Sequence, residues 1–182
     1  IGVGLVGSEM CIRDRSYLSI KEQNQNRPAE KFKNNTLAIN IEENLPFSLT
    51  PDQKKSYQEI AEDMASGSPM LRLLQGDVGS GKTIVAALIA AHVVEDQKQV
   101  VILAPTTILA NQHYESFCEW YGDNENIVLL TSKLPVREKR EIYQKISDGI
   151  VKIIIGTHAV FQDELIYQNL SLVIYDLSLI HI

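Results

Sequence analysis

Short apolar runs alternate with helical patterns from about residue 70 onward. The runs are rich in Val, Ile and Leu, which is typical of parallel strands buried on both faces. They occupy residues 71–75, 100–104, 127–130, 151–155 and 172–175. Helical patterns separate the first four runs, at 82–95, 108–121 and 136–147. This alternation predicts right-handed crossovers and an α/β fold, a parallel sheet with helices on both faces.

A further helix is predicted directly before this region. Thr50 is a good N-cap, Pro51 suits the first helical position, and apolar residues recur on one face until Gly67, which suits the helix end. By contrast, residues 27–44 are polar and charged without an apolar period, so we expect a linker there. The helix 82–95 is apolar almost all round, and we expect it to be buried against the sheet.

The two ends of the chain do not fit this pattern. Residues 1–16 show neither a strand nor a helix period, and both they and residues 177–182 resemble translated sequencing adapter. We therefore expect both ends to be non-native. Residues 17–45 are expected to hold the end of a preceding helix and its linker, and residues 46–176 a nucleotide-binding domain that is incomplete.

Composition limits the possible functions only weakly. The chain has 182 residues, 45% of them hydrophobic, which is enough for one well-buried domain. A net charge of -6 provides no global basic field, so bulk charge neither supports nor excludes a DNA partner. Cys11 and Cys118 lie far apart and form no metal-ligand spacing. With no signal peptide and no apolar run near the roughly 18 residues of a membrane span, we expect a cytoplasmic protein.

The most specific motif is the glycine-rich stretch 76–83, which fits the phosphate-loop pattern GxxxxGK[ST]. Its glycines allow successive N–H groups to surround a phosphate, and the helix that follows points its positive end at the same charge. Lys82 would bind the outer phosphates and the Thr83 hydroxyl would bind Mg²⁺. The alternative, a plain glycine-rich turn, explains neither the apolar run before the motif nor the helix after it. The predicted cofactor-binding residues are Gly76, Gly79, Ser80, Gly81, Lys82 and Thr83, and the predicted cofactors are ATP and Mg²⁺.

Asp176 ends the last apolar run. This is the form of the second nucleotide-binding motif, in which the aspartate holds Mg²⁺ beside Thr83. The aspartate alone is a weak signal, but a phosphate loop in the same sheet strengthens it. We predict Lys82 and Asp176 as the catalytic residues, with Thr83 and Asp176 as the magnesium ligands.

Three other segments follow predicted strands, and each also has a simple structural interpretation. Residues 104–113 combine Pro and Thr at a helix start, where helix capping requires no ligand. Residues 156–159 contain a glycine and a hydroxyl that serve either a turn or a phosphate contact. His113 and His158 have no partners at metal spacing, which argues against zinc. The basic residues of 133–140 are interleaved with glutamates, which favours a solvated helix face over a nucleic-acid contact.

Taken together, LPFSLTPDQ, PMLRLLQGDVGSGKT, APTTILANQH, IVLLTS, IIIGTHAVFQ and LVIYD, in this order, resemble the first motor domain of the RecG family of superfamily-two DNA translocases. The resemblance implies a RecA-like, P-loop NTPase fold and an ATP-dependent DNA helicase that remodels replication forks and recombination junctions. It also implies that Gln53 reads the adenine edge and that phosphates of branched DNA are gripped without reading sequence. The DNA-contacting residues so implied are Pro105, Thr106, Thr107, Thr131, Ser132, Thr157 and His158.

The sequence departs from the family after Asp176. The family continues there with a glutamate that orients the attacking water, and here Leu177 takes its place. We expect a monomeric fragment, inactive by itself, whose parent also holds a wedge domain and a second RecA-like domain. The transcription-repair coupling translocases share much of the pattern and remain an alternative. A P-loop nucleotide-binding module outside the helicases is another.

Overall fold

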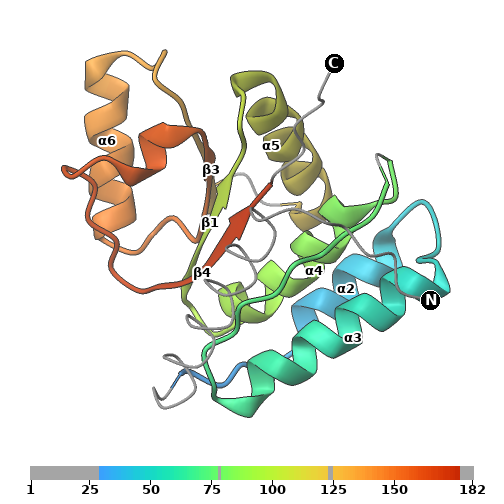
Figure 1. The fold of residues 1–182 in the computed structure, drawn as a ribbon. Coiled ribbons are helices and arrows are strands. Elements are labelled where there is room, and N and C mark those ends of the chain that lie inside the picture. The colour runs from blue at the N-terminus through green and yellow to red at the C-terminus, as the bar shows by residue number, and fades with distance from the viewer. Residues whose placement is uncertain (1–28, 78, 123–124, 177–182) are drawn as a thin grey trace, which may run out of the picture.

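The computed structural model describes residues 29–77, 79–122 and 125–176. Four parallel strands form one sheet in the order β2-β3-β1-β4 (Figure 1). They are β1 (Gln99–Leu103), β2 (Ile127–Leu130), β3 (Ile153–Gly156) and β4 (Leu170–Tyr175). In the centre of the sheet, Val100 pairs with Ile153 on one side and with Leu172 on the other. The predicted parallel sheet is confirmed. The expectations for residues 1–28 and 177–182 lie outside the described residues.

Helices cover both faces of the sheet, as predicted. On one face α4 (Lys82–Glu95) and α5 (Thr107–Tyr121) pack against side chains such as Val100 and Ile102. On the other face α6 (Val136–Ser147) and the short 3-10 helix η1 (His158–Phe161) pack against the alternate residues, such as Val101 and Leu103. Successive strand side chains point to opposite faces, so strands this apolar supply two cores. Nine of the fourteen residues of α4 are buried, which confirms the expected burial of that helix.

The capping residues predicted for the helix after residue 50 are confirmed in α3 (Pro51–Ser66). The Thr50 hydroxyl accepts a hydrogen bond from the Gln53 N–H at 3.3 Å, and the Gln53 side chain accepts one from the Thr50 N–H at 2.9 Å. This reciprocal pair is a capping box. Gly67 ends the helix at a φ of 78°, a conformation that favours glycine.

The prediction of a linker over residues 27–44 is wrong in part, because α2 (Thr36–Asn44) is a helix. Ala38 and Ile41 are three positions apart on one helical face, and both are buried in the core that α4 shares. The Leu37 N–H also donates to the Glu95 carboxylate at 3.2 Å. Burial against the apolar surface of α4 therefore outweighs the weak helical pattern of this segment.

The prediction of a strand at residues 71–75 is also wrong. The segment takes part in none of the pairings among the four described strands, and Figure 1 draws it as coil between α3 and α4. Leu71 is 43% exposed and Leu73 is 70% exposed. A strand is defined by its hydrogen-bonded neighbour, and the described pairing of β4 is with β1. The apolar pattern of residues 71–75 therefore predicted a strand, but none of the described strands pairs with this segment.

A buried histidine joins α3 to α4. The Tyr57 hydroxyl lies 2.9 Å from Nε2 of His92, which is 4% exposed. Burial lowers the pKa of His92 because it disfavours the charged imidazolium. The two helices that this contact joins are those that carry Gln53 and Lys82.

We expect stability to fall as the pH drops from 7.5 to 5.5. Below the ordinary histidine pKa of about 6.5, the unfolded chain takes up a proton that folded His92 resists, so the free energy of unfolding decreases. Thermal melts at the two pH values test this. The variant His92→Gln should lose less stability over the same range. An equal loss in both proteins would show that a group other than His92 controls the pH dependence of stability. Glu30 is not that group, because its hydrogen bond with Lys98 lowers its pKa and so moves its titration below this pH range.

Candidate functional site

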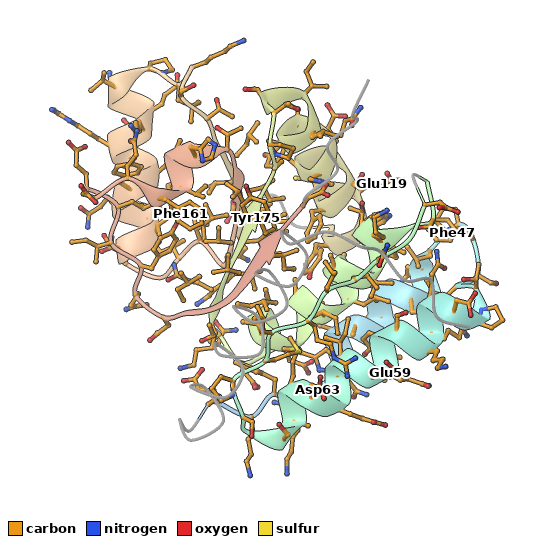
Figure 2. All side chains as sticks on the ribbon, viewed as in Figure 1. Phe47, Glu59, Asp63, Glu119, Phe161 and Tyr175 are labelled. Atoms are coloured by element: carbon orange, nitrogen blue, oxygen red, sulfur yellow. The ribbon has the colours of Figure 1, made fainter. Side chains whose placement is uncertain are left out.

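The predicted site residues gather at the carboxyl edge of the sheet. Pro105 and Thr106 follow β1, Thr131 and Ser132 follow β2, Thr157 follows β3 and Asp176 follows β4, and the phosphate loop precedes α4. In Figure 2, Tyr175 marks the end of β4, one residue before Asp176. Ligands of open α/β sheets bind outside this edge.

Among the helices of the described residues, none combines the length and the apolar character that a membrane span requires.

The phosphate loop curls around its own lysine. Gly79 and Gly81 take positive φ angles of 79° and 78°, and Gly81 is the N-cap of α4. Lys82 Nζ donates to the carbonyls of Gly76 and Asp77 at 2.9 and 2.8 Å. The ammonium therefore lies over the loop at the N-terminus of a 14-residue helix, where a cation and free N–H groups both favour a phosphate.

Gln53 contacts this loop directly. Its side-chain amide donates to the Ser80 carbonyl at 2.8 Å, while the capping box of α3 fixes the rest of the side chain. Gly81 is required by its φ of 78°, which other residues rarely adopt, whereas the nearby Gln53 amide is the end of a flexible side chain. The structure thus brings Gln53 beside the phosphate loop, across 27 residues of sequence.

Asp176 is held by two elements. Its N–H donates to the Leu103 carbonyl at the end of β1 at 2.9 Å, and its Oδ2 lies 2.6 Å from Nε2 of His113 on α5. The strand β4 also packs against α4, which carries Thr83 in its first turn. The histidine was missed as part of the site because no metal spacing pointed to it. Its place on the buried face of α5, with Ala110 and Phe117, was the available signal.

The segment after β1 shows the helix cap that its sequence allows. The Thr106 hydroxyl accepts a hydrogen bond from the Leu109 N–H at 3.2 Å, so Thr106 is the N-cap of α5. Thr107 is the first residue of the helix, and its carbonyl accepts from the Asn111 side chain at 2.8 Å. The capping interpretation of this segment is therefore confirmed. Capping leaves the hydroxyl hydrogen of Thr106 available as a donor.

Backbone hydrogen bonds join the three loops that follow β1, β2 and β3. The Ala104 N–H donates to the Gly156 carbonyl at 2.8 Å, and the Thr157 N–H donates to the Leu130 carbonyl at 3.4 Å. A Cβ on Gly156 would lie 2.1 Å from the Leu130 oxygen, so the close approach of two backbones explains this glycine. Thr131 is buried, whereas Ser132 and His158 are exposed. The loops therefore form one continuous row.

Arg137 and Lys139, two of the basic residues of α6, contact other side chains of this chain, and the choice between a solvated face and a nucleic-acid contact stays a prediction. Arg137 is 91% exposed and pairs with Glu141 one turn later at 3.2 Å. Lys139 contacts Gln162 and lies 5.3 Å from the centre of the Tyr143 ring.

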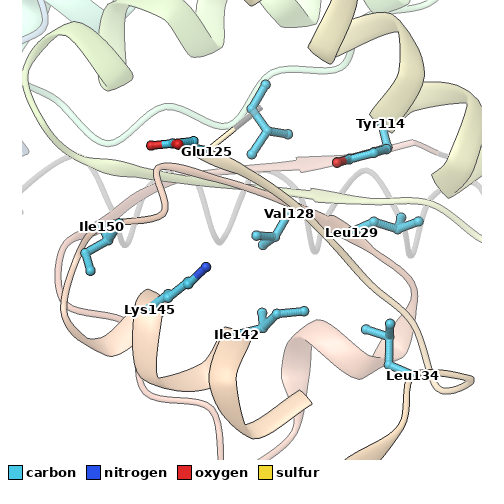
Figure 3. Close-up of a pocket in the computed structure, with 9 residues that line it drawn as sticks. Tyr114, Glu125, Val128, Leu129, Leu134, Ile142, Lys145 and Ile150 are labelled. Carbon is cyan, nitrogen blue, oxygen red and sulfur yellow. The ribbon is translucent and has the colours of Figure 1, made fainter. Parts of the chain in front are cut away.

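A groove of about 610 Å³ lies beside the edge strand β2 and the helix α6 (Figure 3). Its walls are mostly apolar and include Val128, Leu129, Leu134 and Ile142. None of the predicted site residues lines it. Because it lacks a glycine loop and a helix N-terminus, its volume does not make it a phosphate site.

The donors present fit magnesium in the way phosphate-loop proteins bind it. The described residues include no group of three or more histidine, cysteine, aspartate or glutamate side chains able to hold a metal. Mg²⁺ does not need such a group, since it is usually held by one or two carboxylates together with substrate phosphates. Thr83, in the first turn of α4, and Asp176, one residue after β4, offer one hydroxyl and one carboxylate of this kind, and the elements α4 and β4 pack together.

The fold and this site define a P-loop nucleotide-binding domain of RecA-like architecture. The family model described as DEAD/DEAH box helicase matches residues 50–176. The chain therefore belongs to the DEAD/DEAH box helicase family.

Curated relatives with similar sequences are also helicases. The chain is 47% identical over 135 residues to the ATP-dependent DNA helicase RecG of Aquifex aeolicus (74% of this chain, 17% of the relative). It is 48% identical over 136 residues to RecG of Streptococcus pneumoniae (75% of this chain, 20% of the relative). The chain thus spans about a fifth of the length of these curated relatives.

Solved structures show the same likeness. A structure of RecG bound to a three-way DNA junction matches with a TM-score of 0.79 and 39% identity, covering 87% of this chain and 22% of that one. The UvsW helicase of bacteriophage T4 matches with a TM-score of 0.54 at 16% identity, covering 90% of this chain and 52% of that one, which supports the fold alone.

Proposed function

We propose that this chain is the ATP-binding part of a RecG-type DNA helicase motor, whose parent protein moves on branched DNA at replication forks and recombination junctions. The observation that carries the proposal is the joint placement of a glycine-rich loop at the start of α4 and of Asp176 at the end of β4, two elements that pack together. Identities of 47% and 48% to RecG proteins support this type of helicase over the transcription-repair translocases.

In this proposal each residue of the site has one task. Lys82 leaves the carbonyls of Gly76 and Asp77 and binds the outer phosphates of ATP, while Gln53 contacts the adenine edge. Thr83 and Asp176 hold Mg²⁺, which when bound neutralises the charge that develops on the transferred phosphoryl group. Residues 46–176 belong to one RecA-like domain in this proposal. The parent protein also holds a second RecA-like domain and a wedge domain. Its proposed location is the cytoplasm.

The row of loops after β1, β2 and β3 is the proposed contact with DNA. The N–H groups and hydroxyls of 105–107, 131–132 and 157–158 suit phosphates, which such groups bind without reading sequence. An acidic chain can make these contacts because they are local.

Binding of DNA by this chain is therefore expected to be weak, indifferent to sequence and weaker still at higher salt. Fluorescence anisotropy with labelled single-stranded and forked DNA, at low and moderate salt, measures all three. The double variant Ser132→Glu, His158→Glu places two carboxylates on exposed positions of the loops and should weaken binding further. Ser68→Glu, an exposed control beside the end of α3, should not. Sequence-selective binding that ignores salt, or equal effects of the two variants, would overturn the DNA assignment.

A further inference from the structure

His113 contacts the proposed metal ligand but has no task in the chemistry above. Its Nε2 lies 2.6 Å from Oδ2 of Asp176, and the two side chains are only 11% and 19% exposed. An ionised carboxylate accepts hydrogen bonds and donates none, so Nε2 carries the hydrogen and donates it. Hydrogen bonds to a charged acceptor are roughly twice as strong as neutral ones.

The packing of α5 fixes this imidazole. His113 is three residues after Ala110 and four before Phe117, both of them fully buried, so all three lie on one face of α5. That face packs into the core shared with α4 and the sheet. The ring therefore has little freedom to leave Asp176, unlike the partners of an exposed ion pair.

The backbone of Asp176 is fixed separately. Its N–H donates to the Leu103 carbonyl of β1 at 2.9 Å, one residue beyond the paired strand β4. The sheet thus sets the position of the residue, and His113 sets the direction of its carboxylate. A ligand whose rotamer is already fixed loses less conformational entropy when the metal binds.

We propose that His113 is a positioning residue that orients the carboxylate of Asp176 for Mg²⁺. This inference rests on the proposed function, since it assumes that Asp176 binds the metal. Residues that hydrogen-bond to a metal ligand orient it, and their loss typically lowers metal affinity or activity about 10- to 100-fold.

The test compares ATP binding with and without magnesium in the full 182-residue chain. A fluorescent ATP analogue is titrated in Mg²⁺ and in EDTA, and Mn²⁺ bound with the nucleotide is followed by electron paramagnetic resonance. His113→Ala should leave the EDTA affinity unchanged, because the phosphate loop is intact, and should weaken metal binding about 10- to 100-fold. His113→Gln keeps an N–H donor of similar reach and should recover most of the metal affinity that His113→Ala loses.

The controls separate this inference from the function on which it rests. Absence of nucleotide binding in the unmodified chain contradicts the proposed function itself. If Asp176→Ala weakens metal binding while His113→Ala does not, Asp176 is a ligand and the role of His113 is refuted. A loss that extends to the EDTA affinity, or that glutamine does not restore, would make His113 a packing residue and would also overturn the inference.

Discussion

Replacement of Lys82 with alanine should weaken ATP binding about 10- to 150-fold. The ammonium would make charge-assisted hydrogen bonds to phosphate oxygens, and such bonds contribute about 1.5 to 3 kcal/mol. Each 1.4 kcal/mol corresponds to about a factor of ten in affinity. Among the described residues, Nζ donates only to the carbonyls of Gly76 and Asp77, in hydrogen bonds at the surface, so loss of the side chain should disturb the fold little. Isothermal titration calorimetry of the two proteins gives the ratio.

Lys55→Ala is the matched control for this variant. Lys55 is an exposed lysine of α3, and its removal changes the net charge by the same amount as the loss of Lys82. It should leave ATP affinity unchanged. Equal affinities of the Lys82 and Lys55 variants would mean that the glycine-rich loop is not the site.

The substitution Phe117→Ala should destabilise the fold by about 3 to 5 kcal/mol, through lost burial and the cavity it leaves. Phe117 is fully buried on α5. Its ring centre lies 5.7 Å from that of Tyr121, with the two ring planes inclined by 11°, and 6.0 Å from that of Trp120. Net stabilities of domains are about 5 to 15 kcal/mol, so this variant loses a large share of the total. Urea unfolding followed by circular dichroism measures the change.

An exposed residue of the same helix provides the comparison. Ile108 is 72% exposed, and Ile108→Ala should change stability by no more than about 0.5 kcal/mol. If the Phe117→Ala protein is unfolded in buffer, Phe117→Leu should show a smaller loss of the same sign. Similar effects at positions 108 and 117 would contradict the core described above.

The sequence predicts best where a local signal and burial agree. The bounds of α4 and α6 follow from the pattern of residues 82–95 and 136–147, and Thr50 and Gly67 mark α3 by capping chemistry that needs no distant partner. Predictions fail where a distant partner decides. The helix α2 forms because it packs against the apolar surface of α4. The apolar run 71–75 has no pairing partner among the described strands and therefore lies outside the sheet.

The same distinction applies to the site. The phosphate loop is one continuous motif, so its residues are identified together, and Asp176 is recognised by its place at a strand end. The contacts of Gln53 with Ser80 and of His113 with Asp176 span 27 and 63 residues. No local pattern encodes such pairs. The resemblance to RecG assigned Gln53 to the site, and only the fold reveals His113.

The central claim is that the glycine-rich loop at the start of α4 binds ATP. Its most direct test is an amide ¹⁵N–¹H NMR titration of the chain with Mg²⁺ and ATP, which reports on each backbone N–H separately. The largest shifts should fall on Gly79, Gly81, Lys82 and Thr83, with a smaller shift at Asp176. Shifts confined to the groove beside β2, around Val128 and Leu129, or no saturable shifts at all, would contradict the claim.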